Sequence, residues 1–190
     1  MAALLKLLAT TVLALGATAL QRGTATFHGN AAYNGDPYTL NDGSCACWKA
    51  AAYKACAARR CFDQVTSPSL TAALSTPAMD NTAECGACYR VTCVPGRLRG
   101  KRDSELGPWD GCLYPNASVT VMVTDSCPCA HWNPSNKRHC CGPQRHVDLS
   151  FWAFAKIGKL EQGVVDVDLD RVDCGKWEWT GVSDRECASR

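Results

Sequence analysis

The stretch SVTVMVTD at residues 118–125 decides the fold class. Valines at positions 119, 121 and 123 alternate with threonine or methionine, which is the two-residue period of a strand buried on one face. Residues 165–170 repeat this alternation with aspartate as the polar partner, and residues 24–28 and 89–93 are typical of shorter strands. The sequence therefore predicts a mainly β domain, although strand counting alone does not distinguish a barrel from a sandwich.

Two segments predict helical insertions among these strands. Residues 45–62 (CACWKAAAYKACAARRCF) are rich in alanine and contain neither Gly nor Pro, which favours a helix. Ser150 can cap a short helix over residues 151–157 that Gly158 ends. Residues 63–84 carry Pro68 and Pro77 and are predicted as a loop, and residues 126–146 as a second, long loop.

Composition and the N-terminus indicate a secreted protein. The chain has 190 residues, 20% charged and 46% hydrophobic, with a net charge of +2, which argues against a disordered, membrane-embedded or nucleic-acid-binding protein. Residues 1–19 (MAALLKLLATTVLALGATA) have one early lysine, an apolar run and a small-x-small end, as signal peptides do. We expect residues 20–190 to form one extracellular or cell-wall domain; a retained anchor is the alternative.

Fourteen cysteines fit an oxidising compartment and up to seven disulfides. Their spacing does not define the pairing of Cys45, Cys47, Cys56, Cys61, Cys85, Cys88, Cys93, Cys112, Cys127, Cys129, Cys140, Cys141, Cys174 and Cys187. The CGAC sequence at 85–88 leaves a redox pair or a zinc site as alternatives, but we expect no metal and no cofactor. Asn116 opens an Asn-Ala-Ser acceptor sequence for N-glycosylation.

Two aspartates flank the long loop and are the candidates for chemistry. Asp125 follows the strand at 118–124, and Asp148 lies where the loop returns. Glycoside hydrolysis with inversion needs one carboxyl as acid and one as base, about 6.5–9.5 Å apart. An apolar wall would raise the pKa of the acid and keep it protonated. The alternative, which spacing alone favours, is that these residues are a turn residue and a helix cap.

Five short motifs resemble the first domain of expansins, whose fold is shared with family 45 endoglucanases. They are GTATFHG at 23–29, CGACY at 85–89, VMVTDSCP at 121–128, HVDLS at 146–150, and GVV at 163–165 continuing to RVDC at 171–174. The resemblance implies a six-stranded double-psi β-barrel with an open polysaccharide groove. Because expansins carry a second, β-sandwich domain, we expect this chain to correspond to the first domain alone.

The resemblance also implies roles for particular residues. Asp148 matches the general acid of the glucanases, and Asp125 matches a polar partner that is a candidate base. Thr26, His28, Thr124 and His146 match positions around the groove and are the predicted substrate contacts. Trp132 lies in the long loop and is the best candidate for stacking on a sugar ring.

These features predict a secreted, monomeric, expansin-like protein that binds cell-wall β-glucan or xyloglucan and loosens it or slowly cleaves it. The alternative is a non-catalytic barwin-like defence or signalling protein that uses the barrel as a scaffold. A zinc or redox protein is a third class, and a lytic transglycosylase on the same barrel is a further enzymatic alternative.

Overall fold

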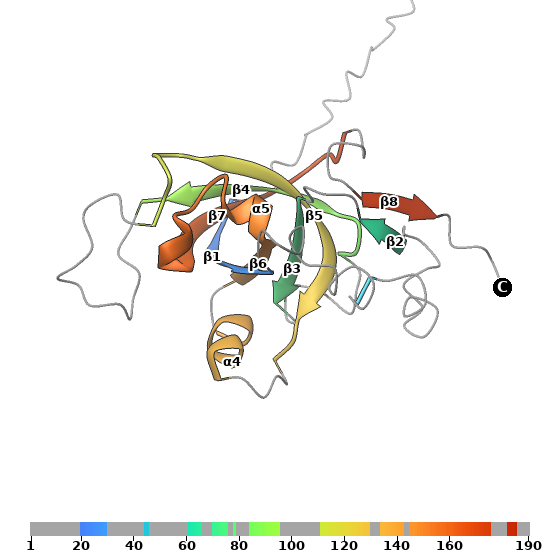
Figure 1. Cartoon of the computed structure of the whole chain (residues 1–190), viewed down its shortest axis with the longest axis horizontal. Coiled ribbons are helices and arrows are strands. Elements are labelled where there is room, and N and C mark those ends of the chain that lie inside the picture. Colours follow the sequence, from blue (N-terminus) through green and yellow to red (C-terminus); the bar gives the residue numbers. More distant parts are fainter. Residues whose placement is uncertain are drawn as a thin grey trace, which may run out of the picture.

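The computed structural model describes residues 20–29, 44–45, 61–65, 70–75, 78, 84–95, 111–129, 134–142, 145–175 and 182–185 (Figure 1). Six strands form a closed barrel in the order β1-β6-β3-β5-β4-β7. They are β1 (Gln21–His28), β3 (Thr71–Ser75), β4 (Cys88–Val94), β5 (Ser118–Cys127), β6 (Arg145–Ser150) and β7 (Val164–Val172). The predicted mainly β, six-stranded barrel is confirmed.

Parallel and antiparallel pairs are mixed in the ring. β1 pairs with β6 and β3 with β5 in parallel, and the other neighbouring pairs are antiparallel. The ring closes because β1 also pairs with β7. A closed ring leaves no unpaired strand edge, so the backbone N–H and C=O groups of each strand find partners on both sides.

The remaining elements are short. They are β2 (Cys61–Val65) and β8 (Val182–Arg185), which form a two-stranded sheet, the helices α4 (Pro134–Cys140) and α5 (Phe151–Phe154), and the 3-10 helix η3 (Leu160–Gln162). Figure 1 shows β2 and β8 to one side of the barrel and α4 below it. No helix among the described residues has the length and apolar character needed to cross a bilayer.

The inward faces of the strands fill the barrel with small and branched side chains. Fully buried members of this core are Ala25, Val91, Val121, Val147, Leu149 and Val167. Alternation explains these positions, since every second residue of a strand faces the same side. The valine pattern at 119–123 therefore predicted the correct face of β5.

α5 contributes the largest buried side chain of the core. The Ser150 hydroxyl accepts the N–H of Ala153 at 3.3 Å, as the predicted helix cap should. Phe154 is fully buried, with its ring centroid 4.8 Å from that of Phe27. A Cβ added to Gly158 would lie 2.7 Å from the Phe154 ring, so only glycine fits where the turn after α5 crosses this ring.

The helix predicted over residues 151–157 ends at Phe154, and three further predicted boundaries are wrong. The predicted loop at 63–84 contains β3, which is buried throughout, and the end of β2. One face of β3 packs in the barrel core through Ala72 and Leu74, and the other packs on Cys127 and Cys140 through Ala73. A strand buried on both faces shows no alternation to detect. The predicted helix at 45–62 cannot reach its stated end, because Cys61 and Phe62 pair with β8; residues 46–60 lie outside the described part.

The third error concerns the long loop at 126–146. β5 does not end at Asp125 but continues to Cys127, and α4 and the first residues of β6 occupy much of the remainder. The tandem Val-Thr pattern of β5 stops at Thr124, so the continuation carries no alternation in the sequence.

Disulfides join the strands to their connections. The five pairs in the described part are Cys45–Cys85, Cys88–Cys174, Cys93–Cys112, Cys127–Cys140 and Cys129–Cys141. The described part contains no free cysteine, which agrees with the disulfide prediction and not with a CGAC redox pair. Cys47, Cys56 and Cys187, and the side chain of Cys61, lie outside what the structure describes.

Candidate functional site

A row of four residues crosses the outer face of the barrel, and we call it the acid row. Its members are Thr26 on β1, Asp148 on β6, Ala73 on β3 and Asp125 on β5. Ala73 is the register partner of both aspartates, and Thr26 is the partner of Asp148. Directly paired residues on neighbouring strands point to the same face. Ala73 packs with Cys127 and Cys140 and not with the barrel core, so this face is the outer one.

The register fixes the separation of the α-carbons of the two aspartates. Asp125 and Asp148 are separated by one strand, so their α-carbons lie two strand spacings, or about 10 Å, apart. The carboxyl separation used by inverting glycosidases is about 6.5–9.5 Å. Ala73 lies between the two aspartates in the row, where it is buried and packs with Cys127 and Cys140.

A bulge in β5 places Asp125 on this face. Ala72 pairs with Val123, but the next residue, Ala73, pairs with Asp125, so the register skips Thr124. Without this shift Ala73 would face Thr124, and Asp125 would point to the other side of the sheet. Thr124 is buried in the bulge, and its carbonyl accepts the N–H of Cys45 at 3.3 Å.

Asp148 is surrounded by groups that favour its ionised form. The Thr26 hydroxyl donates to Oδ1 at 2.6 Å, and His28 Nδ1 lies 3.4 Å from Oδ2. Burial raises the pKa of Asp148, but the hydrogen bond and charge of His28 and the Thr26 hydroxyl outweigh burial and lower it below its ordinary value. The expectation of a raised pKa at Asp148 is therefore wrong: the wall beside it is polar, not apolar.

Beside Asp148, on the same face of β6, a buried histidine contacts Thr26. His146 Nε2 lies 3.0 Å from Thr26 Oγ1, and its Nδ1 lies 2.9 Å from Thr24 Oγ1. Because Thr26 donates its proton to Asp148, its oxygen is free to accept from His146, which places the imidazole proton on Nε2. Burial lowers the pKa of His146 to about 4, so the ring is neutral. Thr24, His146, Thr26 and Asp148 thus form one directed chain of hydrogen bonds.

Asp125 has a different environment. Its Oδ1 accepts the backbone N–H groups of Ser44 at 2.6 Å and Ser126 at 2.7 Å. Burial raises the pKa of Asp125, and these N–H donors oppose the shift only in part. The Ser44 and Ser126 hydroxyls lie 2.7 Å apart, which ties the segment around Ser44 to the end of β5.

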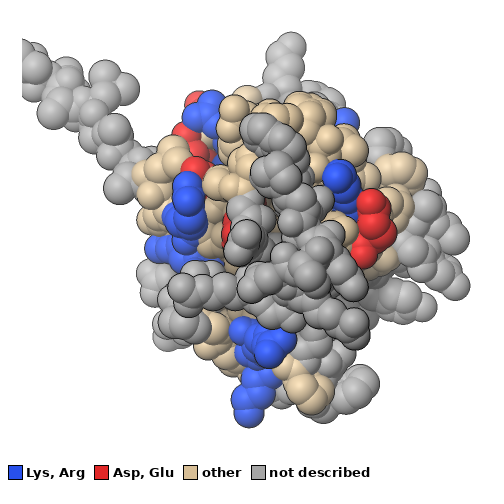
Figure 2. Space-filling model, turned by 90° about the vertical axis from the view of Figure 1, so that its left-hand side faces the viewer, with Lys and Arg blue, Asp and Glu red and all other residues tan. Residues whose placement is uncertain are grey.

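α4 and two disulfides form one edge of the site. α4 packs against β3 and β6, and Cys140 at its end is bonded to Cys127 at the end of β5. The ring of His139 stacks on that of His146, with centroids 5.3 Å apart. The last turn of α4 is basic, with Lys137 and Arg138 exposed. Figure 2 shows blue side chains at the lower edge, where α4 lies, with no red ones beside them among the described residues.

One cluster meets the geometric condition for a metal site. The sulfurs of Cys127 and Cys140 and a ring nitrogen of His146 lie within 4.8 Å of one another. Both sulfurs belong to one disulfide, and a disulfide offers no thiolate to a metal. The oxidised protein therefore does not present this group as a zinc site.

The structure brings most of the predicted site residues together, but in different positions. Asp148, Asp125, Thr26, His28 and His146 lie on the outer face, where His146 is buried, whereas Thr124 is buried in the bulge of β5. Trp132 lies outside the described residues. Asn116 is exposed in a turn and has a positive φ of 59°. Its exposure meets the accessibility that a glycosylation site requires.

Sequence reasoning missed Ala73, Thr24, Ser44 and Ser126. Ser44 is 81 residues from Asp125, and Ala73 lies in a strand that was predicted as a loop. Only the strand register and the bulge connect these residues with the aspartates, and neither leaves a pattern in a single sequence.

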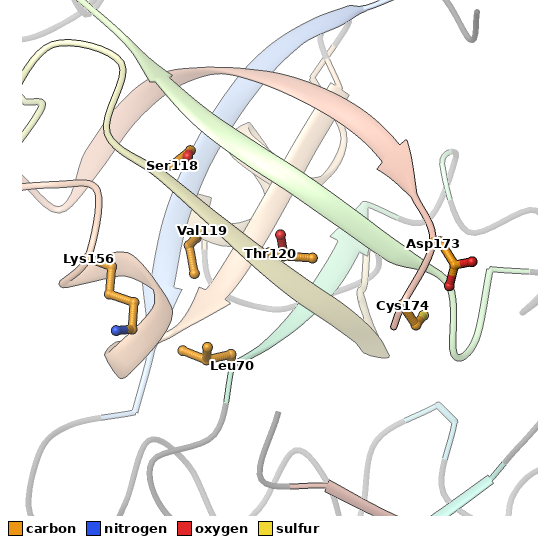
Figure 3. A pocket seen from close by; sticks show the side chains of 7 residues that line it. All are labelled: Leu70, Ser118, Val119, Thr120, Lys156, Asp173 and Cys174. Atoms are coloured by element: carbon orange, nitrogen blue, oxygen red, sulfur yellow. The ribbon is translucent and has the colours of Figure 1, made fainter. Parts of the chain in front are cut away.

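A separate pocket of about 440 Å³ lies near the start of β5 (Figure 3). It is lined by Leu70, Ser118, Val119, Thr120, Lys156, Asp173 and Cys174. Figure 3 shows Lys156 and Asp173 at opposite ends of this group, with Leu70 and Val119 between them. None of the acid-row residues lines it.

Fold and site together define a double-psi β-barrel protein with two carboxyls on its outer face. Residues 71–169, more than half of the chain, match the double-psi β-barrel family described as lytic transglycolase. The chain belongs to this family.

Curated relatives are expansins. The chain is 39% identical over 106 residues to the putative expansin-A26 of Arabidopsis thaliana, covering 56% of this chain and 33% of that protein. Expansin-A32 of Oryza sativa is 37% identical over 107 residues, covering 56% and 35%. The chain thus spans about a third of the length of these relatives. The resemblance to expansins is confirmed.

Among solved structures, the β-1,4-endoglucanase Cel45A of the blue mussel Mytilus edulis aligns with a TM-score of 0.51 and 17% identity. The alignment covers 82% of this chain and 81% of the mussel enzyme. At this identity the match shows a shared fold, which is the fold that the resemblance implied.

Proposed function

We propose that this protein is a secreted, expansin-like domain that binds cell-wall β-glucan through the acid row. The observation that carries the proposal is the register that places Thr26, Asp148 and Asp125 on one outer face with only Ala73 between the carboxyls. The similarity to expansin-A proteins supports the choice of a plant-type wall polysaccharide, and the disulfides support an extracellular location.

The chemistry of the row fits a neutral, hydroxyl-rich polymer. An ionised carboxylate accepts hydrogen bonds from hydroxyl groups, and such charge-assisted bonds are stronger than neutral ones. Asp148 provides that carboxylate, and the hydrogen-bond chain through Thr26 and His146 fixes its orientation before the ligand arrives. Preorganisation of this kind improves affinity because less side-chain entropy is lost on binding.

Binding is tested by sedimentation of the oxidised protein with insoluble polymers. Amorphous cellulose, insoluble xyloglucan and mixed-linkage β-glucan are compared with peptidoglycan, since the family description names a lytic transglycolase. We expect the β-glucans to retain the protein and Asp148→Asn to weaken retention about tenfold. Asp168→Asn is the matched control, because Asp168 pairs with Arg22 at 2.9 Å on another part of the barrel.

The possible outcomes distinguish the function classes. Retention by peptidoglycan alone would favour the lytic transglycosylase alternative. Retention by no polymer, with the protein correctly oxidised, would refute the proposal and favour a barwin-like scaffold. If Asp148→Asn binds as well as the Asp168→Asn control, the acid row is not part of the binding site.

Slow inverting cleavage of the bound glucan is a second candidate function. It is favoured by the placement of Asp125 and Asp148 on one face with a single strand between them, since inverting glycosidases use two carboxyls that flank the scissile bond. Release of new reducing ends from soluble β-glucan measures it. Release that persists undiminished in Asp148→Asn would exclude this pair as its origin.

A further inference from the structure

We infer that the first sugars of an N-linked glycan on Asn116 fold back onto the protein and occupy the pocket at the start of β5. The ligand class is an N-acetylglucosamine disaccharide, which is the covalent root of such a glycan on eukaryotic secreted proteins. The glycan is then a fixed part of the outer surface of the barrel. The inference does not depend on the polysaccharide that the acid row binds.

A tight turn presents Asn116 to solvent. The N–H of Ala117 donates to the carbonyl of Tyr114 at 3.2 Å, with Pro115 and Asn116 at the two central positions. Proline at the first central position and a φ of 59° at the second are typical of a type II turn. Ala117 is fully buried, and its carbonyl accepts the N–H of Cys93 at 2.8 Å. The backbone from which the glycan starts is therefore held in place.

The same turn borders the pocket on two sides. The chain leaves it directly into β5, whose residues 118–120 line the pocket. Before the turn, the N–H of Leu113 donates to the carbonyl of Ile157 at 2.8 Å, next to the lining residue Lys156. Figure 3 shows Ser118 and Lys156 at the same end of the group that lines the pocket. The root of a glycan on Asn116 therefore starts at this end.

The lining of the pocket suits an N-acetylated sugar. The hydroxyls of Ser118 and Thr120 and the ammonium of Lys156 can form hydrogen bonds with sugar hydroxyls and with the acetamido carbonyl. Leu70, which packs partly buried against the core, offers an apolar surface to the acetamido methyl group. The volume of about 440 Å³ lies within the range of small-ligand sites, about 300–1,000 Å³.

Covalent attachment makes a weak sugar contact sufficient. On glycosylation, Nδ2 of Asn116 forms a bond to C1 of the first sugar. The bond from that carbon to a lipid diphosphate breaks, and the amide loses one proton. The tethered sugar then meets the pocket at an effective concentration of about millimolar order. A contact too weak to hold a free sugar is thus populated when the sugar is attached beside it.

The acid row stays open when the pocket is filled. β5 has 10 residues, with Asn116 before its start and Asp125 near its end. At the rise of an extended strand, these two residues lie about 25–30 Å apart along the chain. The glycan and a polysaccharide on the acid row therefore occupy different parts of the barrel surface.

Nuclear Overhauser contacts in the glycosylated, oxidised secreted protein test the inference. With the glycan labelled with carbon-13, we expect contacts from an acetamido methyl group to the methyl groups of Leu70 and Thr120. These contacts should disappear in Thr120→Gln, whose longer side chain fills the pocket and leaves the acceptor sequence intact. Thr92→Gln is the matched control, because Thr92 pairs with Ser118 in the sheet but does not line the pocket.

Urea unfolding gives a second readout. Asn116→Gly removes the glycan and tolerates the positive φ, so the turn is kept. We expect glycosylated wild type to unfold at a urea midpoint about 0.5 M above that of Asn116→Gly. This gap should vanish when both proteins carry Thr120→Gln and persist when both carry Thr92→Gln. Because the test is the change in the gap, the intrinsic effect of glycine cancels.

Three kinds of result would overturn the inference. Sugar contacts to the exposed Tyr114 ring alone would place the glycan on the turn and not in the pocket. Narrow sugar signals without any contact to the protein, or an equal gap in the Thr120→Gln background, would show that the glycan does not dock. Secreted protein from a eukaryotic host that carries no glycan on Asn116 would remove the proposed occupant.

Discussion

Acidification from pH 7 to pH 4 is expected to destabilise the barrel through His146. This ring is 1% exposed, lies between Thr24 and Thr26, and carries no positive charge at neutral pH. Unfolding exposes it to water, where it takes up a proton at its ordinary pKa of 6.5. Because the folded state resists this protonation, acid favours the unfolded chain.

The size of the stability loss follows from the shift in the pKa of His146. Burial lowers the pKa of His146 from 6.5 to about 4. A histidine with a lowered folded pKa contributes its full stability above the unfolded pKa and loses it as the pH falls toward the folded one. Linkage then gives a loss of about 2 kcal/mol at pH 5 and about 3 kcal/mol at pH 4, relative to pH 7.

Urea unfolding followed by tryptophan fluorescence at pH 7, 6, 5 and 4.5 measures this loss. The comparison is with His146→Gln, which keeps an N–H donor for Thr26 but does not titrate. The variant will be less stable at pH 7, so the test is the difference in pH slope and not the absolute free energy. Asp125 titrates in both proteins and its contribution cancels in the difference, whereas His146 and Asp148 act on each other, so the difference includes that coupling.

Equal slopes for wild type and variant between pH 6.5 and 4.5 would refute the reasoning. They would mean that His146 is solvated or already charged in the folded state. The directed chain of hydrogen bonds to Asp148 would then need a different tautomer.

Three further predictions concern the acid row, the core and the surface turn. Ala73→Val should weaken β-glucan retention about tenfold because it fills the space between the carboxyls, whereas Ala73→Ser should not; equal retention would contradict this. Phe154→Ala should lower the free energy of unfolding by about 3–5 kcal/mol, seen as a lower urea midpoint, and a loss below about 1 kcal/mol would show that the ring is not a core element. Asn116→Gln should remove one glycan from protein secreted by a eukaryotic host, measured by intact mass; an unchanged mass would show that this turn is not modified.

Local patterns in the sequence predicted much of the fold correctly. Alternation identified β1, β4, β5 and β7, since each has one face in the barrel core and one outside. The cap at Ser150 was predictable because it depends on a contact three residues away. β3 was not predictable in this way, because one of its faces is buried in the barrel core and the other against Cys127 and Cys140.

The candidate site was predicted as a set of residues but not as an arrangement. Asp125 and Asp148, which the sequence places at the two ends of one predicted loop, lie on one face because each is the register partner of Ala73. Their electrostatics were predicted in the wrong sense for Asp148. The groups that lower its pKa, His28 and Thr26, come from a strand about 120 residues away in sequence, and only the parallel pairing of β1 with β6 brings them there.

The sequence by itself determined the class of the protein: a disulfide-rich, mainly β domain with expansin-like motifs around two aspartates. These properties are local, because alternation, caps and cysteine content do not depend on distant partners. Tertiary structure alone decided the disulfide pairs of the described part, the position of Ala73 between the aspartates and the face that Asp125 occupies. The register shift at Thr124 turns the side chain of Asp125 outward. A shift of one residue depends on how β5 packs against β3, not on the residues of β5 alone.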